Sequence, residues 1–314
     1  MGKIAFVFPG QGSQTVGMGQ SLADKEKSVR AIFRKADERL GMSLSKVIFE
    51  GPQEELTLTT NAQPALLATS IAILEYFKQA EIEADYVAGH SLGEYTALVA
   101  AGAISFEDGI YAVRKRGEFM EEAVPNGEGT MAAVLGLNRE ELEKVTGAVT
   151  EEGNQVQLAN INCPGQIVIS GSRKGVELAS VRAREAGAKR VLPLLVSGPF
   201  HSILMKPAGS KLQGVLDEID FNQAMIPVIA NVSASEMSEP NEIKEKLIEQ
   251  LYSPVQWEDS VKQMLQLGVD TFIEIGPGKV LSGLIKKIDR SIKTYAISDE
   301  ETFQTVFAAL KEGK

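Results

Sequence analysis

The pentapeptide GHSLG at 89–93 separates a short apolar stretch, 85–88, from a stretch of helix-forming residues, 94–101. A G-x-S-x-G motif between a strand and a helix is typical of a nucleophile elbow, in which the glycines permit a sharp turn that exposes the serine. The N–H groups of the first helical turn, beginning with Leu92, have no helical partner and can stabilise an oxyanion. We therefore predict that Ser91 is a nucleophile, and the alternative is an ordinary serine in a glycine-rich turn.

Strand and helix patterns alternate along most of the chain, which predicts an α/β fold with a mostly parallel sheet. Residues 4–8 form a continuous apolar run that ends at Pro9, as expected of a buried parallel strand. The chain of 314 residues is long enough for one large domain or two modest ones. Further strands are expected at 226–232, 271–275 and 293–297.

Residues 126–196 form a separate pattern between two junctions that contain proline and glycine. Their order, β-α-β-β-α-β, is that of ferredoxin-like folds and is compact enough for an inserted subdomain. We therefore predict a ferredoxin-like subdomain over 126–196 and a discontinuous catalytic domain over 1–125 and 197–314. The expected elements of the insert are strands at 130–137, 155–162, 166–172 and 189–196, and helices at 139–149 and 174–186.

The formal net charge of −10 argues against nucleic acid as the main partner of this chain. The single cysteine, Cys163, cannot form an internal disulfide, which fits a reducing compartment. Its tight-turn setting favours a small structural residue over a catalytic thiol. No segment approaches the ~18 apolar residues of a membrane span, and the N-terminal apolar run is too short for a signal peptide. We expect a cytoplasmic protein with no membrane partner.

A serine hydroxyl needs a base within hydrogen-bond reach, and the chain has only two histidines. His90 is adjacent to Ser91 in a tight turn, where neighbouring side chains diverge, so we interpret it as a structural residue. His201 is then the predicted base, with a packed or helix-capping histidine as the alternative. No acidic residue lies near His201 in the sequence, so either a carbonyl group or an acid that the fold brings back would orient its ring. The acidic candidates are Asp217, Glu218 and Asp220.

Arg116 lies in the helix expected after the elbow helix, from which it could reach the same edge of the sheet as Ser91. Its guanidinium group could hold a substrate carboxylate through two hydrogen bonds. The alternative is a solvated charge on an exposed face, together with Arg114 and Lys115, and the spacing does not decide between the two. Gln11 lies between two glycines after the first strand, where it can offer hydrogen-bond donors to a neighbouring site. That loop lacks the lysine of a nucleotide-binding P-loop.

Five motifs, taken together and in this order, resemble those of malonyl-CoA:acyl carrier protein transacylases. The resemblance implies an α/β-hydrolase-like main domain that is interrupted by a ferredoxin-like subdomain. It therefore agrees with the fold class predicted from the strand and helix patterns. The motifs extend over essentially the whole chain and are FPGQGSQ at 8–14, NAQPA at 61–65, GHSLGE at 89–94, GPFH at 198–201 and SPVQW at 253–257.

The resemblance also implies a role for each candidate residue. Ser91 attacks the malonyl thioester, with His201 as general base and then as general acid. Arg116 binds the malonyl carboxylate. The remaining implied roles are an oxyanion hole, made by the backbone N–H groups of Gln11 and Leu92, and the orientation of the histidine, made by Gln250 through its backbone carbonyl.

The implied reaction is transfer of the malonyl group from malonyl-CoA to the phosphopantetheine thiol of acyl carrier protein, in a ping-pong cycle that supplies fatty-acid chain elongation. No metal and no redox cofactor is expected, and we expect a free-standing monomer. Related acyltransferase domains of polyketide synthases share the motifs, and Phe200 resembles their malonyl-type version, in which a bulky ring narrows the pocket. Because carrier proteins are acidic, a local basic patch should dock the carrier. The candidates for this patch are Lys189, Arg190, Lys286 and Lys287.

Two other classes of protein remain possible at this point. A serine esterase or thioesterase could use the same elbow, but such enzymes usually supply an acid for the histidine. A hydrolase of neutral esters also has no use for Arg116. A binding module with a decayed site is the non-enzymatic alternative, although every key side chain of the family is present in this sequence.

Overall fold

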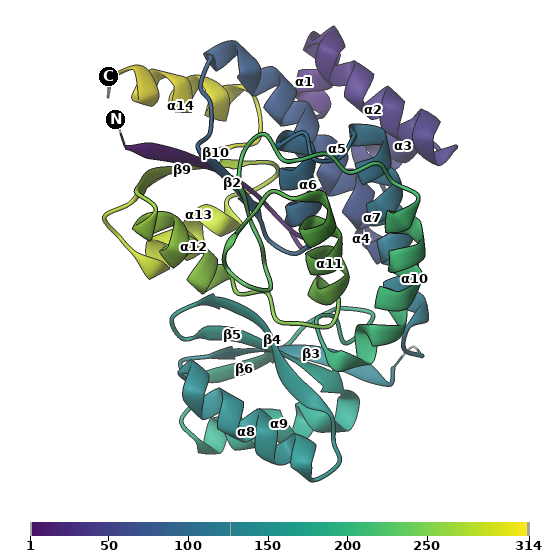
Figure 1. Ribbon diagram of the computed structural model, residues 1–314, viewed down its shortest axis with the longest axis vertical. Helices are drawn as coiled ribbons and strands as arrows, with labels where there is room; N and C mark the ends of the chain where they lie inside the picture. Colours follow the sequence, from purple (N-terminus) through teal and green to yellow (C-terminus); the bar gives the residue numbers. More distant parts are fainter. Residues whose placement is uncertain (1, 126, 313–314) are drawn as a thin grey trace.

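Two β-sheets organise this computed structural model, which describes residues 2–125 and 127–312 (Figure 1). The larger sheet has the strand order β10-β9-β1-β2-β7-β8, and every neighbouring pair except β7 and β8 is parallel. The predicted α/β class with a mostly parallel sheet is therefore confirmed. The strands are β1 (Lys3–Phe8), β2 (Tyr86–Gly89), β7 (Val228–Ile229), β8 (Glu236–Met237), β9 (Val269–Ile275) and β10 (Lys293–Ile297).

Strand β1 lies inside the larger sheet and directs its side chains alternately into two apolar layers. Phe6 and Phe8 are buried in the layer that also contains the apolar side chains of α5 and α7. Ala5 and Val7 are buried in the opposite layer, against α12 and α13. Because helices cover both faces, the strand reads as an uninterrupted apolar run.

The helices around the larger sheet differ in length, and two short 3-10 helices accompany them. They are α1 (Gln20–Lys25), α2 (Lys27–Leu40), α3 (Leu44–Glu50), α4 (Gln53–Thr57), α5 (Thr59–Phe77), η1 (Lys78–Ala80), α6 (Leu92–Ala100), α7 (Phe106–Glu122), η2 (Ile203–Met205), α10 (Lys206–Asp217), α11 (Pro240–Gln250), α12 (Trp257–Gln266), α13 (Val280–Ile288) and α14 (Glu300–Glu312).

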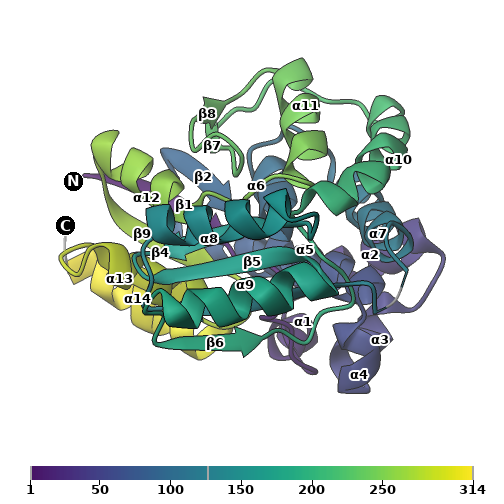
Figure 2. The same cartoon turned by 90° about the horizontal axis from the view of Figure 1, so that it is seen from below.

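The smaller sheet has the strand order β4-β5-β3-β6, and all of its pairs are antiparallel. Helices α8 and α9 cover the face that points away from the larger sheet (Figures 1 and 2). From the other face, Met131 and Ala159 join the apolar core of the rest of the chain. The elements follow the predicted β-α-β-β-α-β order and are β3 (Gly129–Leu135), α8 (Arg139–Glu151), β4 (Val156–Cys163), β5 (Gln166–Ser172), α9 (Arg173–Glu185) and β6 (Arg190–Pro193).

The division of the chain into two domains at 126 and 196 stays a prediction. All four strands of the smaller sheet lie between Gly129 and Pro193, within the predicted insert. The boundary residues Met1, Asn126 and Lys314 lie outside the described residues.

The strand expected at 226–232 is much shorter than predicted, because only Val228–Ile229 pairs in the sheet. Pro227 has no N–H to donate. After the strand, the backbone N–H of Ala230 donates to the carbonyl oxygen of Ser235, which turns the chain into a hairpin with β8. The apolar pattern of this segment therefore predicted the strand but not its early end.

The carboxyl ends of β1 and β2 coincide, because Phe8 and Gly89 are partners in the parallel register. The loop that contains Gln11 and the turn that contains Ser91 therefore start at the same edge of the sheet. In open α/β sheets, ligands bind at this carboxyl edge. The fold thus brings two of the motif-bearing segments together.

Candidate active site

Ser91 connects β2 to α6 in a strained backbone conformation, with φ 52° and ψ −107°. The two glycines of the motif permit this turn because no side chain fits at either position. A Cβ atom at Gly89 would lie 1.9 Å from the backbone of Gly93, and one at Gly93 would lie 2.1 Å from the carbonyl oxygen of Phe8. The pentapeptide has the geometry of a nucleophile elbow.

The Oγ atom of Ser91 lies 2.7 Å from Nε2 of His201, although the two residues are 110 positions apart. Nδ1 of His201 lies 2.7 Å from the backbone carbonyl oxygen of Gln250. Because a carbonyl oxygen only accepts, Nδ1 carries the proton, and the lone pair of Nε2 faces the serine hydroxyl. The structure thus holds a serine–histidine pair in the tautomer that a general base requires.

His201 is almost fully buried, with 3% of its surface exposed. Burial, reinforced by the nearby charge of Arg116, lowers the pKa of His201 to about 3. The imidazole is therefore neutral at neutral pH. The carbonyl of Gln250 takes the position beside Nδ1, so the structure assigns no orienting role to the acidic candidates Asp217, Glu218 and Asp220.

Arg116 extends from α7 into the interior and is 1% exposed. Its Nη1 donates to Oε1 of Gln63 at 2.7 Å, and its Nη2 donates to Oγ of Ser91 at 3.1 Å and to Oε1 of Gln250 at 2.9 Å. The interpretation of Arg116 as a solvated surface charge is therefore wrong. That description fits Lys115, which is partly exposed and pairs with Glu118.

The three hydrogen bonds of Arg116 do not use all of its N–H donors. Its Nε is buried, and among the described residues it has no hydrogen-bond partner. A guanidinium group has five N–H donors in a planar fork that matches a carboxylate. Burying such a charge is costly unless a partner compensates it. This site is therefore suited to an anionic substrate group.

A cavity of about 240 Å³ opens in front of the serine. Met131 from β3 and Asn160 from β4 line it, so the smaller sheet forms part of its wall, together with the loops that follow β1 and β2. The sequence-predicted residues that line the same cavity are Ser91, Leu92, His201, Arg116, Gln11 and Phe200. Gln250 lies behind them and is fully buried.

His90 points away from the serine–histidine pair. Its Nε2 lies 2.8 Å from Oδ1 of Asn162, and its ring lies 5.7 Å from the ring of Trp257. Burial lowers the pKa of His90, so this imidazole is also neutral. These contacts agree with the interpretation of His90 as a structural residue of the elbow.

Three buried polar side chains next to the candidate residues were not predicted from the sequence. Gln63 and Glu94 belong to recognised motifs, at 61–65 and 89–94, but were given no role of their own. Asn231 follows β7 at the carboxyl edge of the sheet. Because ligands bind at this edge in open α/β sheets, its position after a predicted strand could have indicated it. Its Oδ1 accepts from the backbone N–H of Ser91 at 2.7 Å, and its Nδ2 donates to the carbonyl oxygen of Gly89 at 2.7 Å.

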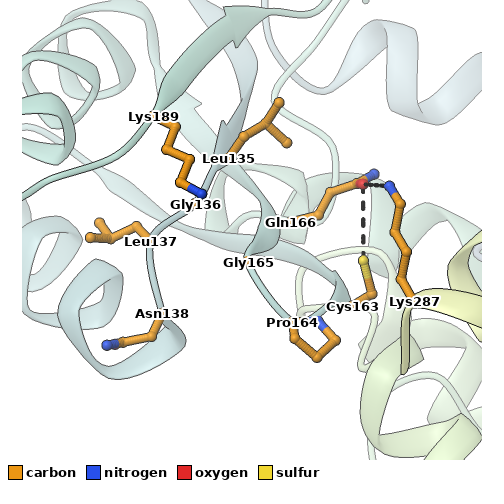
Figure 3. Close-up of a pocket in the computed structure, with 10 residues that line it drawn as sticks. All are labelled: Leu135, Gly136, Leu137, Asn138, Cys163, Pro164, Gly165, Gln166, Lys189 and Lys287. Carbon is orange, nitrogen blue, oxygen red and sulfur yellow. Dashed lines mark hydrogen bonds between the residues drawn. The ribbon is translucent and has the colours of Figure 1, made fainter. Parts of the chain in front are cut away.

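A second hollow, of about 530 Å³, lies at the other end of β3 and contains neither Ser91 nor His201 (Figure 3). Lys189 and Lys287 lie on opposite sides of it, and no acidic residue is among the residues that line it. Lys287 donates to Oε1 of Gln166 at 2.9 Å. Lys286 instead donates to the backbone carbonyl of Arg290, at 3.2 Å, in the loop that follows α13.

Cys163 also lines this second hollow but is buried. Burial raises the pKa of its thiol, which keeps it protonated and unreactive. Cys163 is the last residue of β4 and directly precedes the turn at Pro164 and Gly165, so it is a structural residue beside the predicted turn. Among residues 2–125 and 127–312, no cluster of histidine, cysteine and acidic side chains has the arrangement of a metal site.

Comparison with known proteins identifies the family of this chain. The sequence model described as "Acyl transferase domain" matches residues 5–304. The chain belongs to the acyl transferase domain family. The predicted acyltransferase class is thereby confirmed.

Among curated acyl transferases, the chain is similar to two malonyl CoA-acyl carrier protein transacylases. It is 64% identical over 312 residues to that of Bacillus subtilis strain 168, covering 99% of this chain and 98% of the relative. It is 46% identical over 308 residues to that of Haemophilus influenzae, covering 98% of each. The predicted resemblance is therefore confirmed over nearly the full length.

Solved acyl transferase structures share the fold. An acyl carrier protein S-malonyltransferase from Vibrio cholerae superposes with a TM-score of 0.94 at 47% identity, covering 97% of this chain and 99% of that one. A malonyl-transacylase in complex with its type II PKS acyl-carrier protein superposes with a TM-score of 0.95 at 42% identity, covering 98% and 99%. Both sheets described above therefore belong to a fold that this family shares.

Proposed function

We propose that this acyltransferase moves the malonyl group of malonyl-CoA to the phosphopantetheine thiol of acyl carrier protein, through a malonyl ester on Ser91. One observation carries the proposal: the same Oγ atom contacts a neutral imidazole and a buried guanidinium group. The imidazole explains a nucleophile, and the guanidinium explains a substrate that carries a carboxylate. The names of the related proteins give the acyl donor and the acceptor their chemical identity.

In the first half-reaction, the hydroxyl proton of Ser91 passes to Nε2 of His201 while Oγ bonds to the thioester carbonyl carbon. The negative charge that develops on the carbonyl oxygen is stabilised by the backbone N–H groups of Gln11 and Leu92. When the tetrahedral intermediate collapses, the carbon–sulfur bond breaks. The sulfur of CoA then takes the proton from His201.

In the second half-reaction, the carrier thiol gives its proton to His201 and its sulfur attacks the ester carbonyl. The bond to Oγ of Ser91 breaks, and Oγ recovers the proton. Arg116 holds the malonyl carboxylate in both halves, so the reacting carbonyl stays beside the oxyanion donors. The chain's own residues and the two thiol carriers account for every bond and proton, and we propose that no cofactor takes part.

We further propose that the second hollow helps to dock the acidic carrier protein. Its lining includes Lys189 and Lys287 and no acidic residue, in a chain whose net charge is −10. Met131 lines the Ser91 cavity and Leu135 lines this hollow. Met131 and Leu135 are four residues apart in β3, so these two lining residues are separated by ~13 Å along the strand, which rises ~3.3 Å per residue. Lys286 is a weaker candidate than the sequence indicated, because it already caps backbone carbonyls.

Incubation with malonyl-CoA alone tests the proposed function. We expect a burst of CoA equal to the enzyme concentration and one malonyl group on the peptide that contains Ser91. Continuous CoA release without carrier protein would indicate a hydrolase. The absence of both an adduct and released CoA would indicate a binding module.

The cytoplasmic location and the monomeric state stay proposals. Within residues 2–125 and 127–312, no helix is both long enough and apolar enough to cross a membrane. The carrier protein and malonyl-CoA are the proposed partners, and the negative net charge continues to argue against nucleic acid.

A further inference from the structure

Glu94 is a buried carboxyl group whose position the reaction described above does not explain. It lies in the first turn of α6, three residues after Ser91, and its exposed fraction is 0%. An acidic residue in the first turn of a helix is favoured by the helix dipole, but that effect does not require burial. Removing a carboxyl group from water is costly unless its oxygens find partners.

The main partner of Glu94 is the side-chain amide of Gln250, whose Nε2 donates to Oε2 of Glu94. A second, longer contact comes from the backbone N–H of Asn231, which donates to Oε1 at 3.4 Å. Burial raises the pKa of Glu94 to about 8. In either protonation state, one oxygen remains available to accept from the amide.

The amide of Gln250 connects Glu94 to the substrate-binding arginine. Its Nε2 also donates to the carbonyl oxygen of Ser91 at 3.0 Å, while its Oε1 accepts from Nη2 of Arg116 at 2.9 Å. The two hydrogens of Nε2 therefore face oxygen acceptors, with Oδ1 of Asn231 as a third and more distant one at 3.5 Å, and the single amide oxygen meets a cation. The reversed amide would place its NH₂ group against the guanidinium and its oxygen against two oxygens.

We propose that Glu94 is a positioning residue, which fixes the orientation of the Gln250 amide and thereby holds Arg116 against Ser91 for the substrate carboxylate. The proposal rests on the proposed malonyl transfer. It does not involve His201, since that histidine contacts the backbone carbonyl of Gln250, which a change of side chain leaves in place. Glu94 should therefore affect carboxylate recognition more than the reactivity of the serine.

Two variants separate the hydrogen-bond acceptor from the rest of the side chain. Glu94→Leu removes the acceptor and frees the amide to turn. Glu94→Gln keeps one oxygen that can accept from Nε2, so it should restore most of the lost function. Because the freed amide no longer holds the Arg116 cation through Oε1 of Gln250, we expect Glu94→Leu to slow malonylation about 10- to 100-fold.

The measurement compares two reactions of Ser91 in the full-length enzyme. Malonylation by malonyl-CoA needs the arginine, whereas sulfonylation by phenylmethanesulfonyl fluoride, a neutral reagent, needs only the serine and its base. We expect Glu94→Leu to lower the ratio of the two rates about tenfold or more, and Glu94→Gln to keep it within about threefold of the original enzyme. Equal loss in both reactions, or no rescue by Glu94→Gln, would overturn the proposal.

Glu274→Leu provides a matched control for the loss of a buried carboxyl group. Glu274 is also 0% exposed, but it accepts from the backbone N–H groups of Leu281 and Ser282, outside the Ser91 cavity. Its replacement should leave the ratio of the two rates unchanged. If Glu94→Leu does not fold, Gln250→Leu removes the same bridge and keeps the backbone carbonyl, and it should lower the ratio to the same extent. An unchanged ratio in Gln250→Leu would overturn the proposal.

A failure of the proposed function gives a different result. In that case the unmodified enzyme itself forms no malonyl adduct on Ser91. If the adduct forms normally and the variants leave the rate ratio unchanged, only the role of Glu94 is wrong.

Discussion

Replacing Arg116 with alanine tests how the site selects a substrate that carries a carboxylate. The variant loses the proposed pair of hydrogen bonds to the malonyl group and the existing contact between Nη2 and Oγ of Ser91. Each hydrogen bond to a charged group contributes about 1.5–3 kcal/mol, so the pair contributes about 3–6 kcal/mol. Since 1.4 kcal/mol is tenfold, we expect kcat/KM for malonyl-CoA to fall about 10²- to 10⁴-fold.

Acetyl-CoA is the comparison that isolates the carboxylate. It lacks that group, so Arg116→Ala removes only the contact with Ser91, which both substrates share. The rate of CoA release in the first turnover should therefore fall much more for malonyl-CoA than for acetyl-CoA. An equal loss for both substrates would refute the assignment of Arg116 to the malonyl carboxylate.

Two controls accompany this experiment. Lys115→Ala removes the neighbouring cation, which pairs with Glu118 at the surface, and should change neither rate by more than about twofold. Thermal unfolding should be measured as well, because Arg116→Ala leaves the buried oxygens of Gln63 and Gln250 without their donor. An unpaired buried acceptor costs about 1–3 kcal/mol of stability, which lowers the melting temperature without changing the substrate ratio.

Three further predictions concern the nucleophile, its base and the carrier. Ser91→Ala should abolish the malonyl adduct in intact-mass measurement, and an adduct at full yield would move the nucleophile elsewhere. Because the pKa of His201 is lowered to about 3, the base is deprotonated across the neutral range and gains its proton only as the pH falls towards 3. The first-turnover rate should thus stay flat between about pH 5 and 7, whereas a titration near the ordinary histidine pKa of ~6.5 would contradict the assigned environment. Changing Lys189 and Lys287 to glutamate should raise the KM for carrier protein and leave that for malonyl-CoA unchanged, and an unaltered carrier KM would refute the docking surface.

Local sequence patterns predicted a helix or strand well where an apolar pattern ends at a clear turn signal. The strands at 166–172 and 293–297 were predicted to the residue, because glycine, proline or charged residues bound each apolar run. Strand β8 was missed, because it has only two residues and depends on a turn that follows Ile229. A strand of two residues is too short to show the alternation of apolar and polar residues by which strands are predicted.

The site was predictable where a side chain carries the chemistry. Ser91 and His201 follow from the elbow and from the scarcity of histidines. The contact between Gln250 and His201 uses a backbone carbonyl, which has no sequence signature, so only the family resemblance indicated it.

Spacing also could not tell Arg116 from its two basic neighbours, because burial depends on how α7 packs against the rest of the chain. For the same reason Glu94 resembled an ordinary acidic residue of a helix start. Its inward direction appears only when α6 and α11 lie together around the Gln250 amide.

The proposed role of Ser91 is to carry the malonyl group between two thiols. Its most direct test is intact-mass analysis of the enzyme after malonyl-CoA is added and again after acyl carrier protein is added. We expect one malonyl group on the Ser91 peptide, stable until carrier protein is added and then transferred to the carrier thiol. An enzyme that releases CoA without ever holding a malonyl group on Ser91, or whose adduct goes to water and not to the carrier, would contradict it.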